Sequence, residues 1–135
     1  GERVFLGGLS QGCTMALDAY LREAPRLGLG GFCGSVGFVP SDAHGFPGTI
    51  RAAEVLCEDE AQAARPVWLQ CATDDQHAVP FKRLVEPSMR RVKGRLPGLV
   101  LRNVEGRGHA IEEWEAHFLN DFLHRFAGDA YDARG

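Results

Sequence analysis

The stretch that decides the fold reads Arg-Val-Phe-Leu-Gly-Gly-Leu-Ser-Gln-Gly-Cys-Thr-Met-Ala-Leu and spans residues 3–17. It places the pentapeptide Gly-Leu-Ser-Gln-Gly, residues 8–12, between an apolar run typical of a strand and the apolar spacing of an amphipathic helix. A serine in this setting is typical of a nucleophile elbow, a sharp turn that presents the hydroxyl at its tip. Glycines two residues either side would let strand and helix approach without Cβ clashes. The sequence therefore predicts Ser10 as a nucleophile, with the backbone N–H of Gln11 directed at a developing oxyanion.

Size and charge narrow the classes of function. A chain of 135 residues is long enough for one domain with a core of its own. Fifteen basic against 18 acidic residues leave a net charge of −3, which gives no reason to expect a nucleic-acid partner or an anionic membrane surface. No apolar run has the length of a transmembrane segment, and nothing resembles a signal peptide. A soluble, cytoplasmic protein is expected, although a preceding segment could carry a targeting signal.

Four short apolar runs, each followed by a helical pattern, predict an α/β fold with about four parallel strands and crossover helices. One domain is expected over residues 1–128, with a frayed tail over 129–135. The helix after the elbow should pack its apolar face on the sheet and expose Asp18, Arg22 and Glu23. Pro87 should break the third helical segment and open a short helix that ends at Val92. The strands are expected at 4–9, 31–39, 66–72 and 99–104, and the clearest other helices at about 51–64 and 111–126.

The four cysteines form no Cys-x-x-Cys pair, so a zinc site or a thioredoxin-like motif has little support. Cys33 and Cys71 lie in predicted strands, and Cys13 lies on the inner face of the first predicted helix. Buried, unpaired thiols are therefore expected, as in a reducing compartment. We likewise interpret the acidic run at 58–60 as a solvated helix face and not as a metal site.

A serine nucleophile needs a base, and the base is normally oriented by a carboxylate. His109 is the best placed of the five histidines, because it follows the last predicted strand on a glycine-containing loop, at the same sheet edge as Ser10. His117 and His124 lie within the final helix and are expected to be structural. His44 and His77 lie in loops with no evident partner, and Phe46, Pro47 and Val79 could line an apolar groove.

Several motifs resemble the acyl-protein thioesterase and carboxylesterase family, the phospholipase/carboxylesterase family of α/β-hydrolases. The run Leu-Gly-Gly-Leu-Ser-Gln-Gly resembles its elbow, Gly-Ser-Val-Gly-Phe-Val-Pro (34–40) its sixth strand, and Gly108-His109 its histidine loop. The resemblance implies an acyl ester or thioester as substrate, Ser10 as nucleophile, His109 as base and Gln11 as oxyanion donor, without a metal or an organic cofactor. It covers nearly the whole chain but only the C-terminal half of the family's domain. The N-terminal strands are lacking, so a further segment or another chain is expected to complete the sheet.

The acid of the triad departs from the family's pattern. Leu69-Gln70-Cys71 and the downstream Val79-Pro80 resemble the strand and loop that carry it, but Gln76 occupies the aspartate position. Asp75 is the adjacent carboxylate and the candidate acid. A neutral amide could hold an imidazole but could not stabilise an imidazolium, and a comparable loss of charge in a serine protease costs about 10⁴ in turnover. Two hypotheses therefore remain: an active esterase that uses Asp75, and a catalytically degenerate module that serves as a structural or binding subunit. The chain could also simply be a piece of a longer polypeptide.

Overall fold

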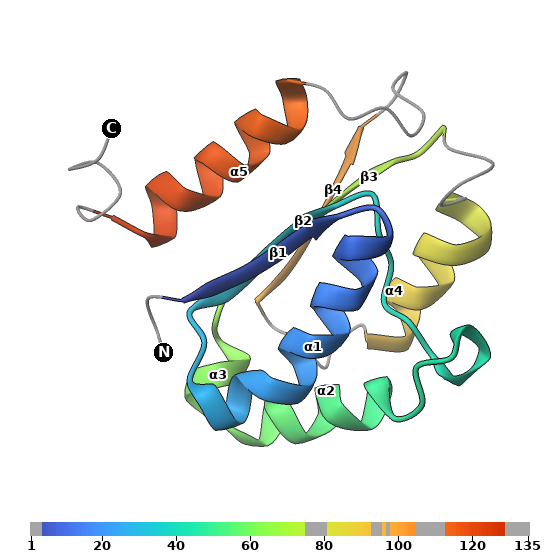
Figure 1. Cartoon of the computed structure of the whole chain (residues 1–135), viewed down its shortest axis with the longest axis vertical. Helices are drawn as coiled ribbons and strands as arrows, with labels where there is room; N and C mark the ends of the chain where they lie inside the picture. The colour runs from blue at the N-terminus through green and yellow to red at the C-terminus, as the bar shows by residue number, and fades with distance from the viewer. Residues whose placement is uncertain (1–3, 75–80, 93–95, 97, 105–112, 129–135) are drawn as a thin grey trace.

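The computed structural model describes residues 4–74, 81–92, 96, 98–104 and 113–128. Its centre is a parallel sheet of four strands whose spatial order follows the chain, β1-β2-β3-β4 (Figure 1). The strands are β1 (Phe5–Leu9), β2 (Gly31–Ser35), β3 (Val67–Ala72) and β4 (Leu99–Val104). Because parallel neighbours need a crossover connection, a helical segment lies between each pair of strands. The predicted α/β architecture is confirmed.

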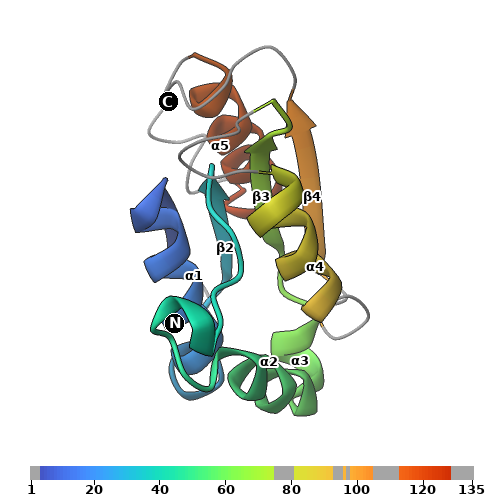
Figure 2. The ribbon, with the colours of Figure 1, turned by 90° about the vertical axis from the view of Figure 1, so that its right-hand side faces the viewer.

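Helices cover both faces of the sheet (Figures 1 and 2). α1 (Gln11–Leu27), α2 (Thr49–Glu58) and α4 (Glu86–Val92) lie on one face, and α5 (Glu113–Phe126) lies on the other. The larger core fills the first face and includes Leu17, Tyr20, Phe32 and Leu69. None of the helices that the structure describes is both long and apolar enough to cross a bilayer.

A smaller, mostly aromatic core joins α5 to the sheet. Phe122 is fully buried, and its ring centroid lies 5.5 Å from Phe5 and 5.5 Å from Trp68. Phe118 is 1% exposed and packs on the same tryptophan. The period of three to four residues that predicted the last helix is therefore the period of its buried face.

The second strand is shorter than predicted. It ends at Ser35, because the next residue, Val36, has φ 53°, in the left-handed region that a β-branched residue rarely adopts. The amide of Val36 still donates to the carbonyl of Gln70, at 2.7 Å. Residues 36–40 remain largely buried although they are not strand. Burial on both faces produced the apolar run, so apolarity alone overestimated the strand by four residues, 36–39.

The helix predicted over 51–64 is two helices. α2 ends at Glu58, Asp59 has extended dihedral angles (φ −92°, ψ 103°), and α3 (Glu60–Ala63) follows. The Asp59 carboxylate accepts a hydrogen bond from the amide of Gln62 at 3.2 Å, which caps α3. The acidic run is exposed, as expected, but one of its members has this structural role.

Pro87 lies where the sequence predicts the start of a new helix. A π-helical turn (Phe81–Val85) precedes it, and Pro87 is the second residue of α4, which ends at Val92 as predicted. The helical segment is thus not broken at Pro87, contrary to the prediction; instead the hydrogen-bonding pattern changes from π to α directly before the proline, which lacks the N–H that either ladder would use.

Candidate active site

The backbone at Ser10 makes the sharp turn that the pentapeptide predicts. Ser10 lies between β1 and α1 with φ 56° and ψ −126°, a conformation that costs a non-glycine residue about 1–3 kcal/mol. Two hydrogen bonds hold it there. Its amide donates to the carbonyl of Ser35 at 3.0 Å, and its carbonyl accepts the amide of Thr14 at 3.2 Å. The turn is thus fixed to the end of β2 and to the first turn of α1.

The two glycines of the pentapeptide are not equivalent. A Cβ on Gly8 would lie 2.5 Å from the carbonyl oxygen of Gly12 and 2.8 Å from the amide nitrogen of Cys13. A Cβ on Gly12 would meet no described atom within 4 Å apart from its chain neighbours and the nearby backbone of its own helix. The expectation that both glycines prevent Cβ clashes is therefore correct for Gly8 and wrong for Gly12, because only Gly8 has the helix backbone above its Cα.

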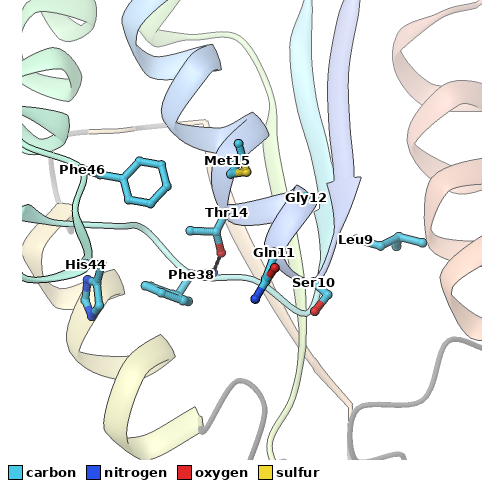
Figure 3. A pocket seen from close by; sticks show the side chains of 9 residues that line it. All are labelled: Leu9, Ser10, Gln11, Gly12, Thr14, Met15, Phe38, His44 and Phe46. Atoms are coloured by element: carbon cyan, nitrogen blue, oxygen red, sulfur yellow. Dashed lines mark hydrogen bonds between the residues drawn. The ribbon is translucent and has the colours of Figure 1, made fainter.

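Gln11 is the first residue of α1, and its side chain is exposed beside Ser10 (Figure 3). The first amide groups of a helix have no acceptor within the helix, and the helix dipole adds positive potential at that end. An anion beside Ser10 would therefore find a favourable field there.

A cavity of about 700 Å³ opens next to the elbow. Ser10, Gln11 and Thr14 line one side of it, while Phe38, His44 and Phe46 come from the segment that follows β2 (Figure 3). The hydroxyl of Thr14 accepts the amide of Phe38 at 3.2 Å, which fastens that segment to α1. The site therefore combines a strained serine with a largely apolar wall.

The loop after β2 contributes more than the sequence predicted. His44, for which no partner was evident, has its Nδ1 3.0 Å from the Ser41 hydroxyl. Its ring packs edge-on against Phe38 at a centroid separation of 4.8 Å. The prediction of Phe46 at an apolar wall is confirmed, whereas Pro47 does not line the cavity. No local pattern marked Phe38 and His44 as neighbours, because their contact depends on the path of residues 36–44.

Three thiols are buried, as predicted: those of Cys13 and Cys71 in the larger core and that of Cys33 in the core under α5. Burial raises the pKa of Cys33 and of Cys71 to about 12, and that of Cys13 still further. A raised pKa keeps a thiol protonated and unreactive at neutral pH. Within the described part of the chain, no group of three or more His, Cys, Asp and Glu side chains is arranged to hold a metal ion.

The remaining predicted site residues, His109 and Asp75, lie outside the described residues, as do Gln76, His77 and Val79. Their loops follow β4 and β3, and both strands run parallel to β1. The carboxyl ends of parallel strands meet at one edge of a sheet. The carboxyl ends of β3 and β4 therefore lie at the same edge of the sheet as Ser10.

β1 is an edge strand of the described sheet, and its outer side is apolar. Val4 is 50% exposed and Leu9 43% exposed. A second cavity, of about 440 Å³, lies between this strand and α5 and is lined by Leu9, Phe118 and Leu119 among others. Exposed apolar surface beside an edge strand is typical of a surface that another element covers.

Comparison with solved structures yields matches with the same arrangement of elements. The crystal structure of Arabidopsis thaliana SOBER1 superimposes with a TM-score of 0.65 at 25% sequence identity, over 93% of this chain and 54% of that one. TT1662 from Thermus thermophilus gives a TM-score of 0.65 at 21% identity, over 92% of this chain and 54% of that one. This chain has an α/β-hydrolase-like fold. It spans about half the length of the solved structures that it matches. No protein-family model matches the sequence, and no curated protein gives a match.

Proposed function

We propose that this chain carries the nucleophile of a serine hydrolase that cleaves acyl esters or thioesters. The observation that supports the proposal best is the backbone of Ser10, a non-glycine residue at φ 56° beside a cavity and a helix N-terminus. Strain of this kind persists where the surrounding structure over-determines it, and it concentrates at functional sites. The hydrolase-like fold is consistent with this function.

In the proposed mechanism, the Ser10 hydroxyl oxygen attacks the acyl carbonyl while His109 accepts its proton. The backbone N–H of Gln11 donates to the oxyanion, and Asp75 stabilises the imidazolium. Collapse of the tetrahedral intermediate breaks the ester or thioester bond, and His109 returns the proton to the leaving alcohol or thiol. Water then attacks the acyl-enzyme by the same route, which releases the acid and restores Ser10.

Labelling with a fluorophosphonate tests the nucleophile. We expect one adduct, mapped to Ser10 by peptide mass spectrometry and lost in Ser10→Ala. Ser41→Ala is the matched control, because Ser41 lies in the loop beside the cavity but hydrogen-bonds His44 and has no elbow geometry. A folded protein that stays unlabelled beside a reactive control esterase would refute the proposal.

The acid is tested by a pair of variants. If Asp75 is the acid, Asp75→Asn lowers kcat by about 10³–10⁴ and Gln76→Asp changes it little. If the triad has lost its acid, Asp75→Asn has no effect and Gln76→Asp raises the rate. The second outcome supports the alternative function, a catalytically degenerate module acting as a structural or binding subunit, for which Gln76 is the motivating observation.

We also propose that further polypeptide, from the same chain or another, pairs with β1 and covers the second cavity. The exposed side chains of Val4, Leu9 and Leu119 support this proposal. Size-exclusion chromatography and urea unfolding test it. A monomer of residues 1–135 that unfolds cooperatively would show that no partner is needed. We further propose a cytoplasmic location, because buried cysteines without disulfides are typical of a reducing compartment.

A further inference from the structure

The loop of residues 41–48, between the end of the β2 segment and α2, forms one wall of the cavity beside Ser10. His44 and Phe46 are its two side chains in that wall (Figure 3). Both are half-buried, while most of the loop around them is exposed. Because the loop is mostly exposed, other contacts must hold it for His44 and Phe46 to stay in the wall.

Part of that reason lies within the loop. The carbonyl of Ser41 accepts the amides of His44 at 2.9 Å and of Phe46 at 3.1 Å. The carboxylate of Asp42 accepts the amide of Gly48 at 3.2 Å, and Gly48 has φ 82°, a left-handed conformation suited to glycine. These bonds define the shape of the loop but do not attach it to the rest of the molecule.

Three residues, Asp18 and Arg22 of α1 and Thr49 at the start of α2, attach it; we call them the Asp18 network. The Thr49 hydroxyl lies 2.6 Å from the Asp18 carboxylate and 3.1 Å from the carbonyl of Phe46. Since a hydroxyl carries one hydrogen, the shorter bond to the charged acceptor dominates. Nε of Arg22 donates to both oxygens of Asp18, at 2.9 and 3.0 Å, and its Nη2 donates to the carbonyl of Pro47.

The surroundings of the network distinguish it from an ordinary surface ion pair. The Asp18 side chain is only 13% exposed, and Thr49 is fully buried. The predicted solvent-facing side is therefore correct for Arg22, which is exposed, and wrong for Asp18, because the loop folds back over this part of α1. By contrast, Arg26 and Glu23, on the same helix, form a pair with side chains 71% and 45% exposed and have no bond to the loop. Water competes less for the part-buried bond between Thr49 and Asp18 than for the exposed pair, so that bond should be the stronger of the two.

We propose that Asp18, Arg22 and Thr49 are positioning residues, whose network holds loop 41–48 where His44 and Phe46 form the substrate-binding wall beside Ser10. None of the three is among the described residues that line the cavity, so none would touch substrate. Arg22 acts on the loop through the carbonyl of Pro47, and Thr49, which directly follows the loop, fixes its end to α1 through Asp18. The inference rests on the proposed acyl ester hydrolysis for its substrate and not for the loop geometry.

The network makes a specific kinetic prediction. Releasing the loop removes His44 and Phe46 from the apolar wall but leaves Phe38, the elbow and the start of α1 in place. Binding of an apolar acyl chain should therefore weaken, whereas the reaction at Ser10 should not. A residue that only stabilised the fold would not weaken the binding of a long acyl chain while leaving the reaction at Ser10 unchanged.

The test uses Thr49→Val and Arg22→Met, with Thr49→Ser as the conservative variant and Arg26→Met as the matched control. Hydrogen exchange of the Phe46 and Gly48 amides should become about tenfold faster in the first two, since a hydrogen bond to a charged group is lost. KM for a hexanoyl ester should rise by about the same factor, with kcat, KM for an acetyl ester and the rate of fluorophosphonate labelling unchanged. Thr49→Ser and Arg26→Met should behave as the parent protein does.

Two results would overturn the inference. One is loop exchange in Thr49→Val and Arg22→Met that equals exchange in Arg26→Met. The other is a faster loop with an unchanged KM for the hexanoyl ester. If the parent protein does not react at Ser10, the proposed function fails, and the exchange comparison still decides whether the network holds the loop. Arg22 is partly exposed, so Arg22→Met keeps the test valid if Thr49→Val fails to fold.

Discussion

The unequal roles of the two elbow glycines yield the sharpest prediction, a comparison of Gly8→Ala with Gly12→Ala. A methyl group at Gly8 would lie 2.5 Å from the oxygen of Gly12, 2.6 Å from its carbonyl carbon and 2.8 Å from the nitrogen of Cys13. All three are backbone atoms of α1, so no side-chain rotation relieves the contact. Relief requires that β1 and α1 separate, although α1 packs on β1 and on the core through Cys13 and Leu17.

The magnitude follows from these contacts. Overpacking a filled site costs about 1–3 kcal/mol, and three backbone contacts below 3.0 Å put Gly8→Ala at the upper end, about 3 kcal/mol of unfolding free energy. Gly12→Ala meets open space in the first turn of α1, where alanine's higher helix propensity should add up to about 1 kcal/mol. The two variants should therefore differ by about 3–4 kcal/mol, a large part of the stability of a typical domain.

Urea unfolding measures the difference, followed by tryptophan fluorescence and far-ultraviolet circular dichroism. With a typical slope of about 1–3 kcal/mol per molar urea, the midpoints should lie at least 1 M apart, with Gly12→Ala at or above the parent protein. Similar midpoints for the two variants, or a Gly12→Ala that unfolds at lower urea than Gly8→Ala, would refute the steric reasoning.

Three further predictions concern the core and its thiols. Phe122→Ala should lower the unfolding free energy by about 3–5 kcal/mol, because the ring is fully buried among Phe5, Trp68 and Phe126; the half-buried Phe126 should cost clearly less when changed to alanine, and equal losses in urea unfolding would contradict the packing. Iodoacetamide on the native protein at pH 8 should modify Cys57 far faster than the other three cysteines, since burial raises the pKa of Cys33 and Cys71 to about 12 and that of Cys13 further; peptide mass spectrometry would reveal any early adduct on the buried thiols. Because their folded-state pKa values exceed those of unfolded cysteine, the stability that these thiols contribute is complete below about pH 8.5 and declines as the pH rises toward 12, so urea midpoints should fall over that range and fall less in Cys71→Ala.

The sequence pattern predicts correctly those elements that depend only on residues close together in the chain. The bounds of β4 agree with the apolar run at 99–104, and the helix that contains Pro87 ends at Val92 as the sequence predicts. The elbow also belongs to this class, because strand, serine and helix are consecutive in the chain. Each of these features depends on residues within a few positions of one another.

Features that depend on distant segments were missed or misjudged. Asp18 was expected in solvent because its own helix exposes that face, but Thr49 and the loop at 41–48 cover it. β2 was expected to continue to Val39 because buried irregular backbone is as apolar as buried strand. The contact between Phe38 and His44 had no signal in the spacing of either residue.

By itself, the sequence determined the parallel α/β framework, the elbow at Ser10 and the candidate partners His109 and Asp75, whose roles remain predictions. Only the tertiary structure decided that Gly8 and not Gly12 permits the close approach of α1, and that the loop after β2 forms a wall beside Ser10. The physical reason is the distance along the chain over which each effect acts. Propensity and periodicity act over one or two turns, whereas the Asp18 network joins residues 31 positions apart, and such contacts exist only once the sheet has brought α1 and α2 together.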